Sequence, residues 1–393
     1  MREPNGEARR WQMSELTAEQ KDIKMAAREF AEKEFRDVAR GLDEKEEFDD
    51  LLWKKAAENG FLGVFIPEEY GGQGLGHFEQ CLILEEFARV DLGIAHQIDS
   101  AFFGAQFILL KGTDAQKARY LPPVCEGRWR IGMASTEPEA GSDVASIATT
   151  AVKEGDHYVL RGTKVFITNC TTSDFLVVMA VTNPDAKKKH ERLSAIIVDT
   201  KSPGFEATKW KGKLSIRCST TGEVNLNEVR APGENLLGEE GKGFYHVMDF
   251  FNRTRLGVAA FGVGTAQGAL DKATAHVRKR KQFGATLATM GVVQTKIAEM
   301  ATLVEAARSL LYRAASKSDG GETDPALVAM AKWYASEVAV KVADEAIQLH
   351  GGSGILAEYD VEHYWRDAKV LEIFEGAKEI EKLLIGRRIL GLH

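Results

Sequence analysis

The stretch Phe175-Leu-Val-Val-Met-Ala-Val181 decides how the chain is organised, because an unbroken apolar run rich in valine is typical of a buried β-strand. Turn formers such as Gly155-Asp156 and Asn183-Pro184 lie on either side of it. Similar β-branched or aromatic runs occur nearby: Tyr158–Leu160, Val165–Ile167 and Ala195–Val198. Short strands separated by turns predict a small antiparallel β domain over residues 131–240.

The chain before residue 131 has helical periodicity. Thr17-Ala-Glu-Gln20 is a capping-box pattern, and apolar residues follow it at three- and four-residue spacing from Ile23 to Ala31. Three further helices are expected: Asp49–Glu58, Phe78–Arg89, and a short one that opens at Thr113 and ends at Pro122-Pro123. Residues 1–130 are therefore predicted to form an N-terminal helical domain.

Strand patterns disappear again from Gly243 onward. Long amphipathic or apolar segments follow: Gly257–Lys281, Val292–Lys317, Pro325–His350 and the shorter Glu375–Leu390. Four helices joined by loops predict an antiparallel four-helix bundle over residues 241–393. The predicted fold class is α+β, with an N-terminal helical domain, a middle antiparallel β domain and a C-terminal four-helix bundle.

The composition argues against nucleic-acid and membrane partners. The chain has 393 residues, 44% of them hydrophobic, so it can bury a large core. Its formal net charge is −7, whereas a nucleic-acid binder normally has a basic face. No apolar run approaches the roughly 20 residues that cross a bilayer, and residues 1–11 lack the apolar core of a secretory signal. We expect a cytoplasmic protein.

Cysteine and histidine spacing predicts neither a metal site nor disulfides. The cysteines form no Cys-x-x-Cys pair: Cys81, Cys125, Cys170 and Cys218. The nine histidines are scattered and include no His-Glu-x-x-His pattern. The cysteines are therefore expected to be reduced thiols, and no metal is expected.

Two glycine clusters lack the context of a nucleotide-binding loop. Gly262-Val-Gly264-Thr-Ala-Gln-Gly268 lies inside a predicted helix with no strand before it, and it lacks the third glycine of the dinucleotide fingerprint. The Gly71–Gly76 loop precedes no phosphate-binding helix of the expected type. Small residues at 262–268 favour a close approach between helices instead.

Glu375 is the strongest candidate for a catalytic group. It lies between the apolar pair Ile373-Phe374 and Gly376, just before a predicted helix. Apolar surroundings disfavour the charged form of a carboxylate, so its pKa rises toward the range of a useful proton acceptor. A Glu at a helix start is also favoured simply by the helix dipole. The residues alone leave both interpretations open.

Five motifs resemble those of the acyl-CoA dehydrogenase family. Thr136-Glu-Pro-Glu-Ala-Gly-Ser-Asp143 is similar to its flavin-loop motif, and Gly162-Thr-Lys-Val-Phe-Ile-Thr-Asn169 to the strand that follows. Arg280-Lys-Gln-Phe-Gly284 and Gln348-Leu-His-Gly-Gly-Ser-Gly354 resemble two further flavin-contacting motifs. Phe374-Glu-Gly376 resembles the catalytic-base motif. The resemblance covers nearly the whole chain in the family's order.

The resemblance implies one FAD per subunit and α,β-dehydrogenation of an acyl-CoA thioester. Glu375 would take the α proton while a hydride passes from the β carbon to the flavin. The residues that would contact the flavin of the same subunit are Met133, Ser135, Thr136, Phe166 and Thr168. Those that would contact the FAD of a neighbouring subunit are Arg280, Gln282, Phe283, Gln348 and Gly352. A shared site implies a homotetramer built as a dimer of dimers.

On the substrate side, the resemblance implies contacts from Ser142, Asn252 and Arg255. Arg255 would be the cation near coenzyme A, and Ser142 would lie on its pantetheine and pyrophosphate side. Two departures weaken the match. Many relatives have Asp where this chain has Asn252, and Thr-Ser where it has Ala377-Lys378.

The acyl-binding region gives mixed indications about the substrate. Residues 212–222 resemble the corresponding stretch of glutaryl-CoA dehydrogenases. Those enzymes pair an Arg with the distal carboxylate, and this chain has Ala95 there, although His96 or an Arg elsewhere in the chain could substitute. Asp99 lies in a segment that lines the acyl pocket in relatives, where a carboxylate is costly unless protonated or paired. A helix-capping role for Asp99 is equally open.

Phe102 and Phe103 would shorten the pocket, which favours short, branched or cyclic acyl groups. The predicted function is therefore FAD-dependent dehydrogenation of such an acyl-CoA, with electrons passed to an electron-transfer flavoprotein. Two alternatives remain. One is an acyl-CoA oxidase that hands electrons to oxygen, and the other is a non-catalytic acyl-CoA-binding protein on the same fold.

Overall fold

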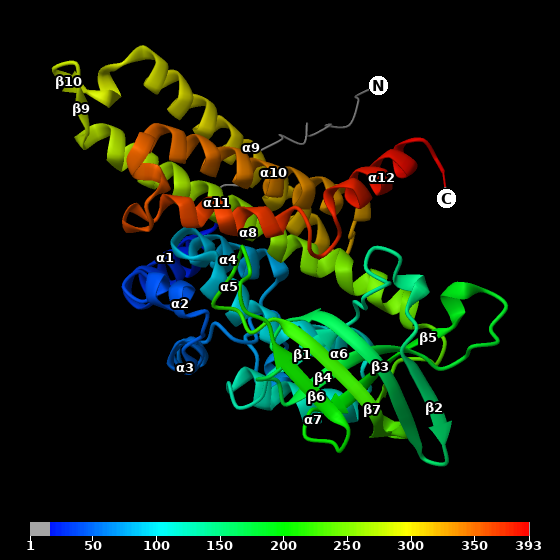
Figure 1. Cartoon of the computed structure of the whole chain (residues 1–393). Coiled ribbons are helices and arrows are strands. Elements are labelled where there is room, and N and C mark those ends of the chain that lie inside the picture. The colour runs from blue at the N-terminus through cyan, green and yellow to red at the C-terminus, as the bar shows by residue number, and fades with distance from the viewer. Residues whose placement is uncertain (1–15, 393) are drawn as a thin grey trace, which may run out of the picture.

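The computed structural model describes residues 16–392. In Figure 1 the first helices, drawn in blue and cyan, lie beside a mainly green sheet, and the long C-terminal helices, drawn in yellow to red, form a layer across them. The opening segment, where we predicted no secretory signal, lies outside the described residues. Among the described residues, no helix has both the length and the apolar character needed to cross a bilayer.

The α-helices before the sheet are α1 (Ala18–Glu34), α2 (Ala39–Lys45), α3 (Asp50–Glu58), α4 (His77–Val90), α5 (Leu92–Asp99), α6 (Phe103–Lys111) and α7 (Asp114–Cys125). The predicted capping box of α1 is present, since Thr17 and Gln20 exchange two hydrogen bonds of 3.1 Å. The predicted end of α7 was wrong, because the helix continues past Pro122-Pro123. Their carbonyl oxygens accept hydrogen bonds from the N–H groups of Glu126 and Arg128, which completes the last turn.

The sheet of the described chain has eight strands: β1 (Ile131–Ala134), β2 (Thr150–Glu154), β3 (His157–Ile167), β4 (Phe175–Val181), β5 (Leu193–Asp199), β6 (Phe205–Lys209), β7 (Gly222–Pro232) and β8 (Leu236–Leu237). Their order is β6-β7-β3-β2-β4-β5-β8, and β1 pairs with β4. Every residue of β4 is buried, as its apolar run predicts.

The sheet is mixed rather than purely antiparallel. β1 runs parallel to β4 over Ile131–Ala134, and β2 meets β4 in one parallel pair, Thr150 with Val181. The other strand pairs are antiparallel. The prediction of an antiparallel domain was wrong at these two contacts. β2 and β3 lie between β1 and β4 in the chain. They provide the connection that lets β4 run beside β1 in the same direction as β1.

The helices after the sheet are α8 (Gly243–Lys279), α9 (Gly291–Asp319), α10 (Pro325–His350), α11 (Val361–Leu371) and α12 (Lys378–Ile389). Three predictions need correction. α8 begins well before Gly257, α11 was not predicted, and α12 begins after Glu375. A two-residue hairpin, β9 (Lys281–Gln282) with β10 (Ala285–Thr286), also joins α8 to α9, so strands do not vanish entirely beyond Gly243.

The glycines of α8 allow it to pack closely between α4 and α10. A β-carbon at Gly264 would lie 2.2 Å from the carbonyl oxygen of Glu85, and one at Gly262 would lie 2.7 Å from that of Ala335. Such contacts are too short for any side chain. The prediction that these glycines serve helix packing is confirmed, and so is the order of helical, sheet and helical domains.

Candidate active site

Glu375 lies in the loop between α11 and α12, in a backbone conformation that few residues adopt. Its φ is +55°, and Gly376 follows with a φ of +107°. A β-carbon at position 376 would lie 2.1 Å from Oε1 of Glu381, so only glycine fits there. Because neither residue has helical backbone angles, α12 begins only at Lys378.

Residues of α8 and α10 hold this loop in place. The Thr254 hydroxyl donates to Oε2 of Glu375 (2.6 Å), and Nε of Arg255 donates to the Glu375 carbonyl oxygen (2.9 Å). From α10, Nζ of Lys332 donates to the carbonyl oxygen of Gly376. The carboxylate is therefore fixed in position although it belongs to a loop.

Burial and charge act in opposite directions on the Glu375 carboxylate. Burial raises the pKa of Glu375, whereas the Thr254 hydrogen bond and the charges of Arg255 and Lys332 lower it, and the net shift is upward. Desolvation lowers the pKa of Lys332 itself to about 8. A carboxylate with a raised pKa, held by defined contacts, is suited to accept a proton from carbon.

Glu381 completes the cluster of charges behind the Glu375 carboxylate. It is fully buried, and its Oε1 lies 3.2 Å from Nε of Arg255. Sequence reasoning missed Glu381, Lys332 and the contact from Thr254. The one available signal was the single charge at Lys332 within the otherwise apolar segment Ala326–Ala335. Arg255, predicted to contact coenzyme A, is buried against the base loop, and its contact with coenzyme A stays a prediction.

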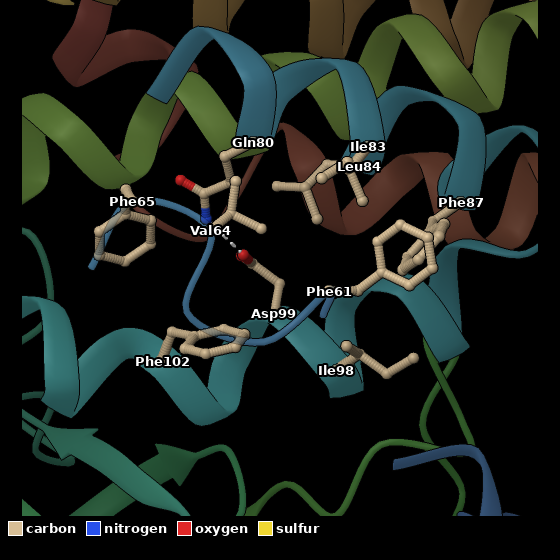
Figure 2. Close-up of a pocket in the computed structure, with 10 residues that line it drawn as sticks. All are labelled: Phe61, Val64, Phe65, Gln80, Ile83, Leu84, Phe87, Ile98, Asp99 and Phe102. Atoms are coloured by element: carbon tan, nitrogen blue, oxygen red, sulfur yellow. Dashed lines mark hydrogen bonds between the residues drawn. The ribbon is translucent and has the colours of Figure 1, made fainter. Parts of the chain in front are cut away.

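Asp99 is the second acidic group near this site. It is buried at the end of α5, and its Oδ1 accepts a hydrogen bond from Nε2 of Gln80 on α4 (2.8 Å), as Figure 2 shows. Burial, assisted by the negative charge of Glu375, raises the pKa of Asp99 to about 7. The alternative role as a helix cap was wrong, because the Asp99 side chain makes no capping hydrogen bond.

Phe102 and Phe103 take different positions. Phe102 is buried and lines the small cavity around Asp99, together with Phe61, Phe65 and other apolar side chains (Figure 2). Phe103 is half-buried and its ring lies edge-on to Phe250 of α8, with centroids 6.1 Å apart. Phe102 therefore lines this cavity and Phe103 does not. Their shortening of an acyl pocket stays a prediction.

His96 does not supply the cation that a distal carboxylate would need. The side chain is buried, with its ring centroid 5.4 Å from that of Phe374. Burial lowers the pKa of His96 to about 3, so the ring is neutral at physiological pH. The suggestion that His96 replaces an Arg at this level was therefore wrong.

The predicted flavin-loop residues lie at or just beyond the C-terminal ends of β1 and β3. Met133 lies in β1, Ser135 and Thr136 follow the strand, and all three residues are half-buried. On β3, Phe166 has a φ of +60° and is 66% exposed, with its ring edge-on to Trp210 at 4.9 Å. An exposed aromatic side chain in a strained backbone conformation is typical of a ligand-contacting position. Thr168, just beyond β3, is half-buried.

A buried ion pair joins this loop to β3. Nζ of Lys164 lies 2.8 Å from Oε1 of Glu137 and donates to the Ser135 carbonyl oxygen (3.0 Å). The Glu137 carboxylate also accepts hydrogen bonds from the N–H groups of Ala148 and Thr149 (2.7 and 2.9 Å). The pair fixes the segment that carries Ser135, and sequence reasoning did not find it.

The second group of predicted cofactor residues lies elsewhere. Arg280, Gln282 and Phe283 are exposed at the β9–β10 hairpin, and Phe283 is 96% exposed. Gln348 lies in the last turn of α10 and Gly352 in the turn after the helix, and both are exposed. Figure 1 shows this hairpin at the end of α8 that is far from the sheet. One chain does not bring the two groups together.

Ser142 and Asn252, the remaining substrate candidates, lie on different elements. Ser142 is exposed in the loop after β1, and Asn252 is half-buried on α8, two residues before Thr254. Among the described residues, neither side chain has a hydrogen-bond partner. Both are free to contact a ligand, and their roles stay predictions.

Comparison with known proteins identifies the family of this chain. Three family models cover nearly the whole chain: the N-terminal domain of acyl-CoA dehydrogenase matches residues 17–128, the middle domain 132–229 and the C-terminal domain 241–390. The chain belongs to the acyl-CoA dehydrogenase family. Members of this family are flavoprotein oxidoreductases that act on a CH–CH bond.

Individual relatives are similar to this chain over nearly their full length. A 3-(aryl)acrylate reductase of Clostridium sporogenes is 38% identical, covering 95% of this chain and 99% of the relative. Subunit CarC of the caffeyl-CoA reductase–Etf complex of Acetobacterium woodii is 40% identical, with the same coverage. The structure of butyryl-CoA dehydrogenase from Megasphaera elsdenii is similar with a TM-score of 0.93 and 36% identity, covering 96% and 99% of the two chains.

The residues of this acyl-CoA dehydrogenase fit a flavin. The exposed ring of Phe166 beside Trp210 provides an aromatic surface, and the hydroxyls of Ser135 and Thr136 lie on the segment that Lys164 fixes. A large planar and polar ligand would cover apolar surface that otherwise faces water. The donor set therefore suits an isoalloxazine edge, and Met133, Ser135, Thr136, Phe166 and Thr168 are the residues that would hold it.

Proposed function

We propose that this protein is an FAD-dependent acyl-CoA dehydrogenase that acts on a short, branched or cyclic acyl-CoA thioester. The observation that carries the proposal is the position of Glu375, a fixed carboxylate with a raised pKa. Its backbone N–H donates no hydrogen bond to any described residue. This N–H is therefore free to stabilise the oxygen of an enolate that develops when an α proton leaves.

Each group would have a separate task in the reaction. Glu375 would take the α proton, and its carboxylate would become a carboxylic acid. FAD, when bound, supplies the acceptor for the hydride that leaves the β carbon. Thr254 and Arg255 would keep the carboxylate aimed at the α carbon, and the double bond forms as both hydrogens leave.

We also propose that FAD is shared between subunits. The exposed group around Phe283 is remote from the loop around Ser135, so it suits contact with the FAD of a neighbouring chain. A dimer of such pairs would give the predicted homotetramer. Electron transfer to an electron-transfer flavoprotein is supported by the Acetobacterium woodii relative, whose name includes an Etf complex.

A second candidate is the reverse reaction. Both relatives described above are named reductases, one of an arylacrylate and one of caffeyl-CoA. The same residues would serve in that direction, because Glu375 would then donate a proton to the α carbon of an enoyl-CoA. The direction depends on the electron partner and not on the position of the base.

Anaerobic flavin bleaching with a panel of acyl-CoAs tests the proposal. We expect bleaching with butyryl-, isobutyryl- or cyclohexanecarbonyl-CoA. Glu375→Gln should retain FAD but reduce the bleaching rate by about 10²- to 10⁴-fold, the usual contribution of a general base. Glu379→Gln, a change at an exposed acid on α12, is the matched control and should react normally.

Other outcomes would identify the rivals. Near-normal bleaching in Glu375→Gln would move the base elsewhere, with Asp99 the next candidate. Peroxide formed at the rate of turnover would favour an oxidase. No bleaching with any acyl-CoA or enoyl-CoA would favour a non-catalytic binding protein.

A further inference from the structure

A single polar pair interrupts the apolar wall of the cavity beside the base. Figure 2 shows Asp99 and Gln80 facing each other among aromatic and aliphatic side chains, including Phe61, Phe65 and Phe102. The cavity itself is small, with about 10 Å³ of free space. A carboxyl group in such surroundings is costly unless a ligand or a protein group satisfies both of its oxygens.

The protein satisfies only one oxygen of Asp99. Oδ1 accepts the hydrogen bond from Gln80, whose own Oε1 lies 3.2 Å from Nδ1 of His77. Among the described residues, Oδ2 has no hydrogen-bond partner. The chain His77–Gln80–Asp99 therefore orients the carboxyl group and leaves one oxygen available. Burial raises the pKa of Asp99 to about 7, so near neutrality this group can donate or accept.

Gly257 keeps the free oxygen uncovered on the side of α8. A β-carbon at this position would lie 3.7 Å from Oδ2 of Asp99 and 3.2 Å from Leu84. A side chain there would lie in contact with the oxygen. The glycine leaves this space open, although glycine weakens a helix by about 1 kcal/mol relative to alanine.

The two residues of α8 that neighbour the free oxygen and the proposed base are about one helical turn apart. Thr254, which contacts Glu375, and Gly257, which is next to Asp99, are three residues apart on one face of α8. Three residues correspond to a rise of about 4.5 Å along the helix. An acyl group whose α carbon meets Glu375 would thus place its distal atoms, a few bonds further on, near Asp99.

We propose that Asp99, held by Gln80, binds a hydroxyl group on the acyl moiety, so that the preferred substrate is a compact hydroxylated acyl-CoA and not a pure hydrocarbon. This inference rests on the proposed function. A distal carboxylate does not suit the site, because it would add a third acidic group beside Asp99 and Glu375, and the nearby His96 is neutral. A neutral hydroxyl supplies the missing hydrogen bond without added charge.

Matched acyl-CoA pairs test the inference. The pairs are 4-hydroxybutyryl-CoA with pentanoyl-CoA, and 3-(4-hydroxyphenyl)propionyl-CoA with 3-phenylpropionyl-CoA, compared by the anaerobic rate of flavin reduction in the FAD-loaded enzyme. We expect at least one hydroxylated member to be preferred in kcat/KM by about tenfold or more, because it alone satisfies the buried polar group. Asp99→Leu should remove this preference while retaining reaction with the hydrocarbon member.

Gly257→Ala provides a second variant that leaves Asp99 itself unchanged. Its methyl group would cover Oδ2 of Asp99, so the variant should also weaken the preference for the hydroxylated acyl-CoA. If Asp99→Leu does not bind FAD, Gly257→Ala alone tests whether Oδ2 causes this preference. Glu379→Gln is the control and should keep the wild-type preference.

Equal rates for both members of both pairs in the wild type would overturn the inference and leave the proposed function intact. So would loss of reaction with both members in Asp99→Leu, which would indicate a role in the chemistry. Failure of all acyl-CoAs to reduce the wild-type flavin would instead contradict the proposed function.

Discussion

At the scale of single residues, the proposed base, Glu375, is defined by what surrounds it more than by its own identity. Glu375 has a raised pKa because burial outweighs three contacts that favour its charged form. The Thr254 hydroxyl is the contact that touches the carboxylate directly, at 2.6 Å. Since only the ionised base accepts a proton, activity should rise with pH through the raised pKa of Glu375.

Thr254→Val should shift the acid side of the pH–rate profile to higher pH. The change removes a hydrogen bond to the ionised carboxylate, which contributes about 1.5–3 kcal/mol. At 1.36 kcal/mol per pKa unit, the shift should be about one unit or more. The measurement is the rate of anaerobic flavin reduction between about pH 5 and pH 9, fitted for its apparent pKa.

Thr254→Ser is the matched control, because it keeps the hydroxyl and loses only a methyl group. Its profile should follow the wild type. A valine variant with an unchanged apparent pKa would show that the hydroxyl does not act on the base.

At the scale of elements, α8 connects the parts of the molecule. Its first half carries Thr254 and Arg255 toward the base loop, and its middle packs against α4 and α10 through glycines. Its far end leads into the exposed β9–β10 hairpin (Figure 1). The close packing of this helix therefore sets the position of both contacts to Glu375.

Gly264→Ala should destabilise the protein, although alanine favours helices. The new β-carbon would lie 2.2 Å from the carbonyl oxygen of Glu85, so α4 and α8 would have to move apart. Overpacking of this kind costs about 1–3 kcal/mol. Thermal or urea unfolding of the FAD-loaded enzyme measures the change.

Gly386→Ala is a control in the same chain. It is also a helical glycine, on α12, but no atom lies within 4 Å of an added β-carbon. The variant should be neutral or more stable by up to about 1 kcal/mol. Equal effects of the two substitutions would show that helix packing at Gly264 is not tight.

At the scale of the whole molecule, a buried cluster around His363 of α11 joins the three domains. Nε2 of His363 lies 3.1 Å from Asp367 and 3.7 Å from both Asp43 of α2 and Asp91, the N-cap of α5. Asp367 in turn accepts a hydrogen bond from the Ile216 N–H, between β6 and β7 (2.7 Å). The cluster thus connects each domain to the other two.

The charges facing His363 favour its protonated form. The group includes four carboxylates and the cations that pair with them: Asp43, Asp91, Asp360, Asp367, Arg217, Arg366 and Lys272. The carboxylates raise the pKa of His363 well above its ordinary value, although burial alone would lower it. The ligand atoms of Asp43, His363 and Asp367 lie within 4.8 Å of one another, a spacing compatible with a metal, but Arg366 and Arg217 already pair with Asp43.

The stability contributed by His363 should depend on pH. Because the folded state holds the proton more tightly, this contribution is fully present below the ordinary pKa of about 6.5. It should decline as pH rises from that value through the higher folded pKa. His363→Gln should cost about 3–5 kcal/mol at pH 6, since it leaves buried carboxylates without their partner, and should flatten this decline.

His157→Gln is the control, because within the described part of the chain His157 pairs only with Asp156, at the surface. Its free energy of unfolding should change by less than about 1 kcal/mol. Urea unfolding at several pH values between about 6 and 9 separates the two variants. An unchanged pH dependence in His363→Gln would show that the cluster is not held together by this proton.

The sequence by itself determined the succession of helices, strands and helices, because the spacing of apolar residues and the turn formers act locally. It also indicated Glu375, since the Glu-Gly pair after an apolar run is a local pattern, and Gly376 indeed needs a φ that favours glycine. α11 escaped prediction, as did the parallel pairing of β1 with β4.

Only the tertiary structure decided how the site is built. Thr254 and Glu375 are 121 residues apart, and Gln80 and Asp99 lie on separate helices, so no local periodicity relates them. The parts played by Lys332 and Glu381 follow only from the tertiary structure, because there the pKa of each group depends on the charge of the other. Local patterns choose the elements, whereas desolvation and hydrogen bonds between distant segments set the chemistry of the groups they carry.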